Sequence, residues 1–156
     1  MHPSLELFIT LTIRVDRPIV IFNDPGKLKR QLIPISGGEM MGRLRGRILP
    51  GGMDSQVIDR EGVCRLSARY GVETEDGKRF FIENNGIRRV PARYLPQLFA
   101  DDMAFFSTIP PDEIYFFTTP TFEVADDALS FLQKEIFIGR GARGYDGLVM
   151  AFYQLR

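Results

Sequence analysis

The chain has 156 residues, 44% of them hydrophobic, which is typical of one globular domain with a substantial core and excludes a disordered segment. Lysine plus arginine and aspartate plus glutamate number 20 each, so the zero net charge gives no reason to expect nucleic acid or an anionic membrane as a partner. Cys64 is the only cysteine, which excludes an intrachain disulfide.

The first ten residues, MHPSLELFIT, lack the basic start and the small-residue cleavage site of a secretory signal peptide. No apolar run approaches the roughly 20 residues that are needed to span a bilayer. We therefore expect a cytoplasmic protein that consists of a single domain over residues 1–156.

The first clear element is a strand over residues 5–15, where apolar and polar side chains alternate and only Phe8 breaks the pattern. Alternation of this kind places one face of a strand on a core and the other in polar surroundings. A short strand follows at 19–22. Residues 23–26, with the sequence Asn-Asp-Pro-Gly, then predict a turn.

Glycines punctuate the next part of the chain. We predict strands over residues 28–36 and 39–49, separated by a tight turn at Gly37-Gly38, and a second tight turn at Gly51-Gly52. Neither glycine pair has the spacing or the helical context of a phosphate-binding loop. The single glycines inside residues 39–49 predict bulges or bends of the kind that a curved sheet requires.

A β-hairpin is the clearest local signal in the chain. A short strand at 55–58 precedes a long one at 63–74, which meets a strand at 78–83 across Asp76-Gly77. Glycine adopts a positive φ at little cost and aspartate tolerates it, so this dipeptide between two alternating runs predicts a tight hairpin turn.

The pattern changes over residues 91–111, where prolines, an acidic pair and aromatic residues predict an irregular excursion with a helical turn. This excursion is expected either to cap the mouth of a barrel or to form a dimer contact. A short helix is predicted at 126–135, with Asp126 as its cap. The remaining strands are predicted at 114–124, 136–138 and 148–155, with a loop at Gly139-Arg140-Gly141, in which Arg140 is a candidate anion contact.

About 8–10 short strands with one short helix predict an all-β fold, an antiparallel closed or nearly closed β-barrel. Closure removes the exposed strand edges that promote aggregation, and a barrel of this size can hold one small ligand. A two-sheet sandwich is the alternative architecture.

Motifs in a fixed order carry a family resemblance. They are Ser36-Gly37-Gly38, Leu49-Pro50-Gly51-Gly52 with Asp54, Ala68-Arg69-Tyr70, Asn85-Gly86 with Arg88, Thr119-Pro120 with Phe122-Glu123, and Phe137-Ile138-Gly139 with Gly141. From Leu5 to the C-terminus the chain resembles the domain of unknown function 3237 family, also called uncharacterised protein family 0311. The resemblance implies a lipocalin-like antiparallel barrel and, for some relatives, assistance in cyclisation steps of natural-product pathways.

Three positions depart from the pattern of that family. Ser55 stands where the family has Trp, Phe117 where it has Arg, and Phe131-Leu132-Gln133 where it has an aromatic residue followed by Leu-Asn. The excursion that begins at residue 91 is also longer than is typical. A pocket that depends on the family Trp or Arg would therefore have altered chemistry in this chain.

Histidine and cysteine are too few for most catalytic centres. His2 is the only histidine and Cys64 the only thiol, so neither a zinc or iron site nor a Ser-His-Asp triad is expected. The position of Cys64 in the middle of a strand predicts a buried, inert thiol. We predict no metal and no cofactor.

Carboxylates and arginines beside the motif glycines are the remaining candidates for chemistry. A carboxyl group inside a barrel loses hydration, its pKa rises, and it can then act as a general acid or base near neutral pH. An arginine in the same cavity can hold a carboxylate or an enolate. The catalytic candidates are Glu39, Asp54 and Glu123, and the ligand-binding candidates are Arg69, Tyr70, Glu83, Asn85, Arg88 and Tyr115.

Strand parity limits this set. Arg69 and Tyr70 are consecutive in one strand, so they cannot both point inward unless a bulge intervenes. The competing interpretation is structural, with Arg69 or Arg88 pairing with a carboxylate to satisfy the polar groups of a closed barrel.

The sequence therefore predicts a small-molecule-binding barrel, and one form of this hypothesis is an acid/base catalyst of isomerisation or cyclisation. The alternative is a non-enzymatic module that acts through its surface or as a homo-oligomer. The expected partner is a small molecule or a second copy of the chain, and neither nucleic acid nor a membrane is expected.

Overall fold

The computed structural model describes residues 1–100, 105–143 and 147–156, which form ten strands in one antiparallel sheet. The strands are β1 (Leu5–Val15), β2 (Ile19–Asp24), β3 (Leu28–Gly42), β4 (Gly46–Ile48), β5 (Gly52–Asp59), β6 (Cys64–Thr74), β7 (Arg79–Arg89), β8 (Tyr115–Val124), β9 (Phe137–Arg143) and β10 (Leu148–Leu155).

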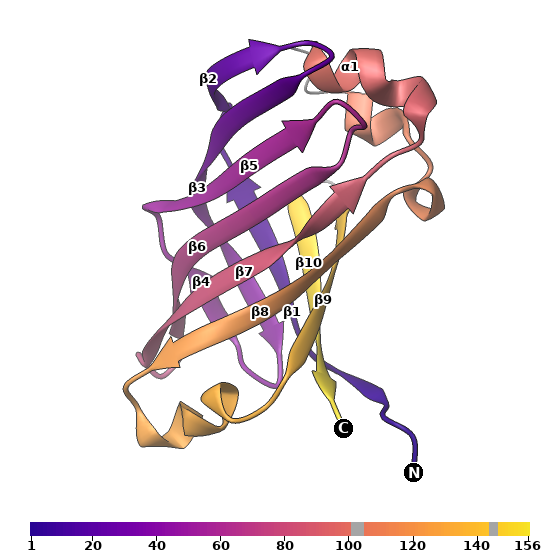
Figure 1. Ribbon diagram of the computed structural model, residues 1–156. Helices are drawn as coiled ribbons and strands as arrows, with labels where there is room; N and C mark the ends of the chain where they lie inside the picture. Colours follow the sequence, from indigo (N-terminus) through magenta and orange to yellow (C-terminus); the bar gives the residue numbers. More distant parts are fainter. Residues whose placement is uncertain (101–104, 144–146) are drawn as a thin grey trace.

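The sheet closes on itself because β1 pairs with β10 along one edge and with β3 along the other. The closed circuit runs β1-β10-β9-β8-β7-β6-β5-β3, and the two additional strands are β4, which bridges β3 and β6, and β2, which pairs with β3 (Figure 1). The predicted antiparallel barrel is therefore confirmed as a closed barrel of eight strands, and the two-sheet sandwich is wrong.

Alternating side chains build the interior, as the sequence pattern predicts. In β6 the residues Cys64, Leu66, Tyr70 and Val72 are buried, whereas Arg69 on the opposite face is exposed. In one half of the barrel the core is aromatic: the Phe122 ring meets the Phe80, Phe137 and Phe152 rings with centroids 6.0, 5.1 and 6.1 Å apart.

The two ends of the barrel are covered differently (Figure 1). One end carries η4 (Asp127–Gln133), which confirms the predicted short helix, and Asp126 caps it by accepting a hydrogen bond from the Ala128 backbone N–H. The other end is covered by residues 91–100 and 105–114, called the cap segment below. It contains η1 (Ala92–Tyr94), α1 (Leu95–Phe99), η2 (Phe105–Thr108) and η3 (Pro111–Glu113).

The cap segment is fixed to the barrel by its own small core and by hydrogen bonds. Leu98, Phe105 and Ile109 pack with Val90, which directly follows β7. The Asn23 amide donates to the Phe99 carbonyl at 2.6 Å, and the Lys29 ammonium donates to the Leu98 carbonyl at 3.1 Å. The described residues contain no helix that is long and apolar enough to cross a bilayer.

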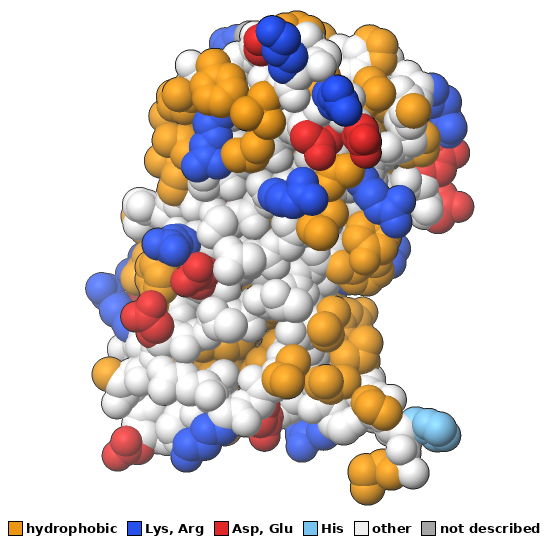
Figure 2. All heavy atoms as spheres, in the orientation of Figure 1, with side chains coloured by type: hydrophobic (Ala, Val, Ile, Leu, Met, Phe, Trp, Pro, Cys, Tyr) orange, Lys and Arg blue, Asp and Glu red, His pale blue; other side chains and the backbone are white. Residues whose placement is uncertain are grey.

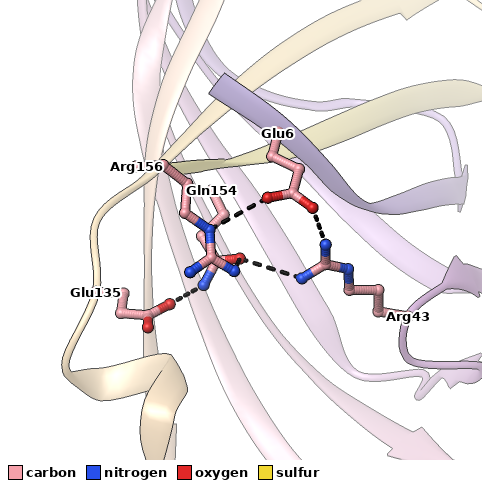
Figure 3. Close-up of polar contacts among 5 residues, drawn as sticks. All are labelled: Glu6, Arg43, Glu135, Gln154 and Arg156. Carbon is pink, nitrogen blue, oxygen red and sulfur yellow. Dashed lines mark hydrogen bonds and ion pairs between the residues drawn. The ribbon is translucent and has the colours of Figure 1, made fainter. Parts of the chain in front are cut away.

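A polar cluster lies at the opposite end, near the chain termini (Figure 3). Glu6 accepts hydrogen bonds from Arg43 and, at 3.2 Å, from Arg156. The buried Gln154 accepts from Arg156 at 2.9 Å and donates to Glu135. These contacts tie β1, β10 and the segment before β9 together.

The strand β2 is exposed along its whole length and carries an apolar surface at the capped end, where Figure 2 shows hydrophobic side chains gathered. Its apolar residues Ile19, Ile21 and Phe22 are 50, 56 and 46% exposed. This strand lies outside the closed circuit, so the barrel itself does not need it for closure.

Two glycine motifs differ from the expectation. Gly37-Gly38 lies inside β3 and Gly139-Arg140-Gly141 inside β9, so the predicted turn and the predicted loop are wrong. A Cβ on Gly141 would lie 2.5 Å from the Phe116 ring, which occupies the place of a side chain there. The turn at Gly51 and the hairpin turn at Gly77 are confirmed.

Candidate functional site

A cavity of about 250 Å³ lies where the cap segment meets the barrel. Most of its wall is formed by apolar side chains from β3, the cap segment, β8 and β10. These are Ile33, Ile109, Ile114, Phe116 and Leu148. Gly141 contributes no side chain, which leaves room for the Phe116 ring beside the cavity. Such a space suits the apolar body of a small organic molecule.

Two buried amides form the polar part of the cavity wall. Gln31 of β3 and Gln56 of β5 are opposite each other in the strand register and are 7 and 2% exposed. The Gln31 Nε2 donates to the Gln56 Oε1 at 2.9 Å, and the Arg88 Nη2 of β7 donates to the same oxygen at 3.4 Å. These bonds fix the three polar groups in place before any ligand arrives.

Asp54 lies one hydrogen bond behind this group. Its Oδ2 accepts from the Gln56 Nε2 at 2.9 Å, and its Oδ1 is buried without a hydrogen-bond partner among the described residues. Burial raises the pKa of the Asp54 carboxyl above its ordinary value, and the Gln56 hydrogen bond and the Arg88 charge offset only part of that rise. Asp54 is thus a buried acid that loses its proton at a higher pH than an exposed aspartate does.

Two further titratable groups face the interior. The Tyr70 hydroxyl is buried without a partner among the described residues, and burial together with the nearby Asp54 charge raises its pKa. Burial also raises the pKa of the Cys64 thiol to about 11, so the predicted buried thiol is confirmed and it stays protonated at neutral pH. Neither group lines the cavity.

We expect Asp54→Asn to stabilise the protein at neutral pH. Because the folded-state pKa is raised, the unfolded chain loses the Asp54 proton at lower pH, and native stability falls as pH rises from about 3.8 through the folded-state pKa. Asparagine removes this penalty and can still accept from Gln56. At pH 7 the free energy of unfolding of the variant should be ~1 kcal/mol larger. For a chain of this length, that difference raises the Tm by about 2–4 °C.

Thermal denaturation of both proteins from pH 3 to pH 8 measures this effect. The difference in Tm should shrink as pH falls below about 3.8, where Asp54 becomes protonated in the unfolded state as well as in the native state. A variant that melts below the wild type at pH 7 would show that the Asp54 carboxylate stabilises the fold, which contradicts the expectation.

Arg88 occupies the boundary between the barrel interior and the cap segment. Its guanidinium lies 4.5 Å from the centroid of the Phe106 ring, and it lines the cavity together with Arg140 and Arg143 of β9. Arg140 also lies over the Phe117 ring, 5.3 Å from its centroid. Stacking on an aromatic ring holds a guanidinium in position without neutralising its charge.

The predicted site residues separate according to strand parity. Asp54, Tyr70 and Arg88 point into the barrel, and Arg69 and Tyr70 lie on opposite faces of β6, as predicted. The structure brings Asp54 and Arg88 together through Gln56. What these residues do there stays a prediction.

The other six candidates lie on the outer face and do not line the cavity. Glu39 forms an ion pair with Arg14 at 2.5 Å, and Glu83 binds Arg69 at 3.2 Å and accepts from Asn85. Glu123 is exposed, and Tyr115 lies under the Arg89 guanidinium. The two departures from the family pattern at Ser55 and Phe117 also fall on outward-facing positions of their strands.

Sequence reasoning missed Gln31, Gln56 and Phe106. The available signal was parity: Gln56 shares a strand face with Asp54 and Ile58, and Gln31 shares one with Lys29 and Ile33. A neutral amide that shares a strand face with a charged side chain is easily taken for a surface residue. Among the described residues no group of three or more His, Cys, Asp or Glu side chains is placed to hold a metal ion.

Comparisons with known proteins agree with this architecture. A UPF0311 protein of Clostridium acetobutylicum is 38% identical over 153 residues, which cover 97% of this chain and 94% of that protein. A crystal structure of a protein with unknown function from the same species matches with a TM-score of 0.88 at 36% identity, covering 99% of this chain and 100% of that one.

A crystal structure described as a beta-barrel like protein, from Acinetobacter baumannii, matches with a TM-score of 0.79 at 25% identity and covers 100% of this chain and 98% of that one. The family model described as protein of unknown function (DUF3237) matches residues 3–155. The chain therefore belongs to the DUF3237 family, whose barrel fold it shares.

Proposed function

We propose that the chain binds a small organic molecule in the cavity between the cap segment and the barrel. One observation carries this proposal: the buried amides Gln31 and Gln56 and the Arg88 guanidinium converge on a space with otherwise mainly apolar walls. A few fixed polar groups in an apolar cavity can orient a ligand while its apolar body is removed from water.

The reaction class that this arrangement supports best is acid/base catalysis of an isomerisation or a cyclisation. Asp54 is a buried acid behind the cavity wall, its Oδ1 has no hydrogen-bond partner among the described residues, and proton transfer to a ligand would have to pass through the Gln56 amide or a water molecule. A carboxyl group with a raised pKa is suited to proton transfer near neutral pH. Arg88 would stabilise the enolate or carboxylate charge that such a reaction develops.

We expect Leu148→Trp to abolish ligand binding by filling the cavity. Leu148 lies at the start of β10 and lines the cavity, whereas its neighbour Val149 has the opposite parity and does not line it. The measurement is a thermal-shift screen with small carboxylates, phenols and polyketide-like aromatic compounds. A ligand at 100 times its Kd stabilises the native state by about 2.7 kcal/mol, which is easily detected as a higher Tm.

The matched control is Val149→Trp, which adds the same bulk on the other face of the strand. Compounds that raise the Tm of the wild type should also raise that of Val149→Trp and should leave Leu148→Trp unchanged. A screen without any hit, together with a dimeric mass in solution, would instead favour the surface module or homo-oligomer, for which the exposed apolar strand β2 is available.

A further inference from the structure

Basic residues occur in the wall of the cavity although the chain as a whole is neutral. Arg88, Arg140 and Arg143 are among the lining residues, with the Arg140 guanidinium turned toward the outer face over the Phe117 ring, and no aspartate or glutamate is among the described lining residues. A partly enclosed space with low-dielectric walls strengthens the field of charges of a single sign. The cavity therefore differs from the rest of the surface in its electrostatic character.

Several arginine side chains elsewhere on the barrel have carboxylate partners, whereas Arg30 and Arg89 form no ion pair with a described residue. Arg14, Arg47, Arg69 and Arg79 each form an ion pair across neighbouring strands or along the same sheet face. None of the three cavity arginines has an ion-pair partner within the described part of the chain. Within the described residues, these three guanidinium groups are therefore not held in ion pairs.

Two acidic residues of the described chain near this end of the barrel are engaged in other ways. Glu113 of the cap segment accepts hydrogen bonds from Arg93 and, at 3.3 Å, from the Tyr94 hydroxyl. Asp54 accepts from the Gln56 amide and forms no ion pair with Arg88, and its burial favours the uncharged acid. Arg88 is held between the Gln56 oxygen and the Phe106 ring, without an ion-pair partner among the described residues.

We propose that the ligand of this cavity is an aromatic carboxylate whose anionic group binds the Arg88 guanidinium. A guanidinium presents paired N–H donors that match the two oxygens of a carboxylate. The Phe106 and Phe116 rings and the aliphatic wall at Ile114 receive the aromatic body. This inference rests on the proposed function, because it names the ligand class of the same cavity.

Matched acids and amides test the charge requirement directly. Isothermal titration calorimetry at low ionic strength would compare benzoate with benzamide, cinnamate with cinnamamide, and 2-naphthoate with 2-naphthamide. Each amide has nearly the shape of its acid and lacks the charge. Because hydrogen bonds to charged groups contribute about 1.5–3 kcal/mol, we expect at least one acid to bind the wild type roughly 10–100 times more tightly than its amide.

Arg88→Met keeps much of the length and apolar surface of the side chain and removes its charge. We expect it to reduce the affinity for the acid to that for the amide while changing the affinity for the amide less than about threefold. The control is Arg89→Met at the adjacent residue, whose guanidinium lies on the outer face, 4.4 Å from the centroid of the Tyr115 ring. This control should preserve the wild-type preference for the acid.

The outcomes separate this inference from the proposed function. Equal affinities of the wild type for acid and amide would overturn the carboxylate assignment and leave the binding cavity intact. An acid preference that survives in Arg88→Met would overturn the role of Arg88. Binding of no compound to the wild type would contradict the proposed function itself. The comparison within the wild type needs no variant, so misfolding of Arg88→Met cannot obscure the charge requirement.

Discussion

Phe122→Ala should destabilise the protein by about 3–5 kcal/mol, the usual cost of removing a buried phenylalanine ring. Phe122 is 7% exposed, and its ring lies edge-on to the rings of Phe137 and Phe152. The closed barrel limits how far the surrounding strands can move inward, so the cavity left by the ring cannot collapse fully. Chemical denaturation monitored by circular dichroism would measure the loss.

Phe22→Ala is the matched control for this substitution. Phe22 is 46% exposed on β2, outside the closed circuit of strands, so the same change there should cost no more than about 0.5 kcal/mol. Comparable losses in the two variants would mean that the aromatic cluster inside the barrel does not dominate its stability.

Gly38→Ala should destabilise the protein by about 3 kcal/mol or more, which is large for the addition of one methyl group. Gly38 lies in β3 where it pairs with both β1 and β4, and its φ is +146°. A Cβ at this position would lie 2.0 Å from the Thr12 carbonyl oxygen and 2.9 Å from the Ile48 side chain. Relief requires the backbones of two strands to separate.

Gly51→Ala isolates the contribution of backbone conformation. Gly51 also has a positive φ, +102°, but a Cβ there would meet nothing within 4 Å. We expect a cost of roughly 1–2 kcal/mol from the left-handed conformation alone. Chemical denaturation of the two variants gives the free energy of unfolding that each one loses. The loss in Gly38→Ala minus the loss in Gly51→Ala measures the steric clash at Gly38. Equal costs would show that β1 and β3 are free to adjust.

Local periodicity was sufficient to predict most of the barrel. The terminal strand β10 has the predicted bounds, and the hairpin turn at Asp76-Gly77 connects β6 and β7 as expected. Alternation in β6 also placed Tyr70 inside and Arg69 outside. These features depend on neighbours within a few residues along the chain, because side-chain parity and turn chemistry are local properties.

The glycine motifs could not be interpreted from local sequence alone. Gly139 and Gly141 have the composition of a loop, yet they lie in β9. Glycine is required there because the inward side chains of Thr118 and Phe116 on β8 occupy the space that a Cβ would need. The sequence around the glycines contains no information about which neighbouring strand will supply those side chains.

By itself, the sequence predicted most of the strands and their two faces, and it favoured an antiparallel barrel over a two-sheet sandwich. Only the tertiary structure decided which polar residues share the cavity. Gln31 and Gln56 become hydrogen-bonded partners through the register of β3 and β5, and Arg88 joins them from β7, 32 residues after Gln56. The physical reason is that register and closure depend on the packing of the whole chain, whereas alternation depends only on each strand.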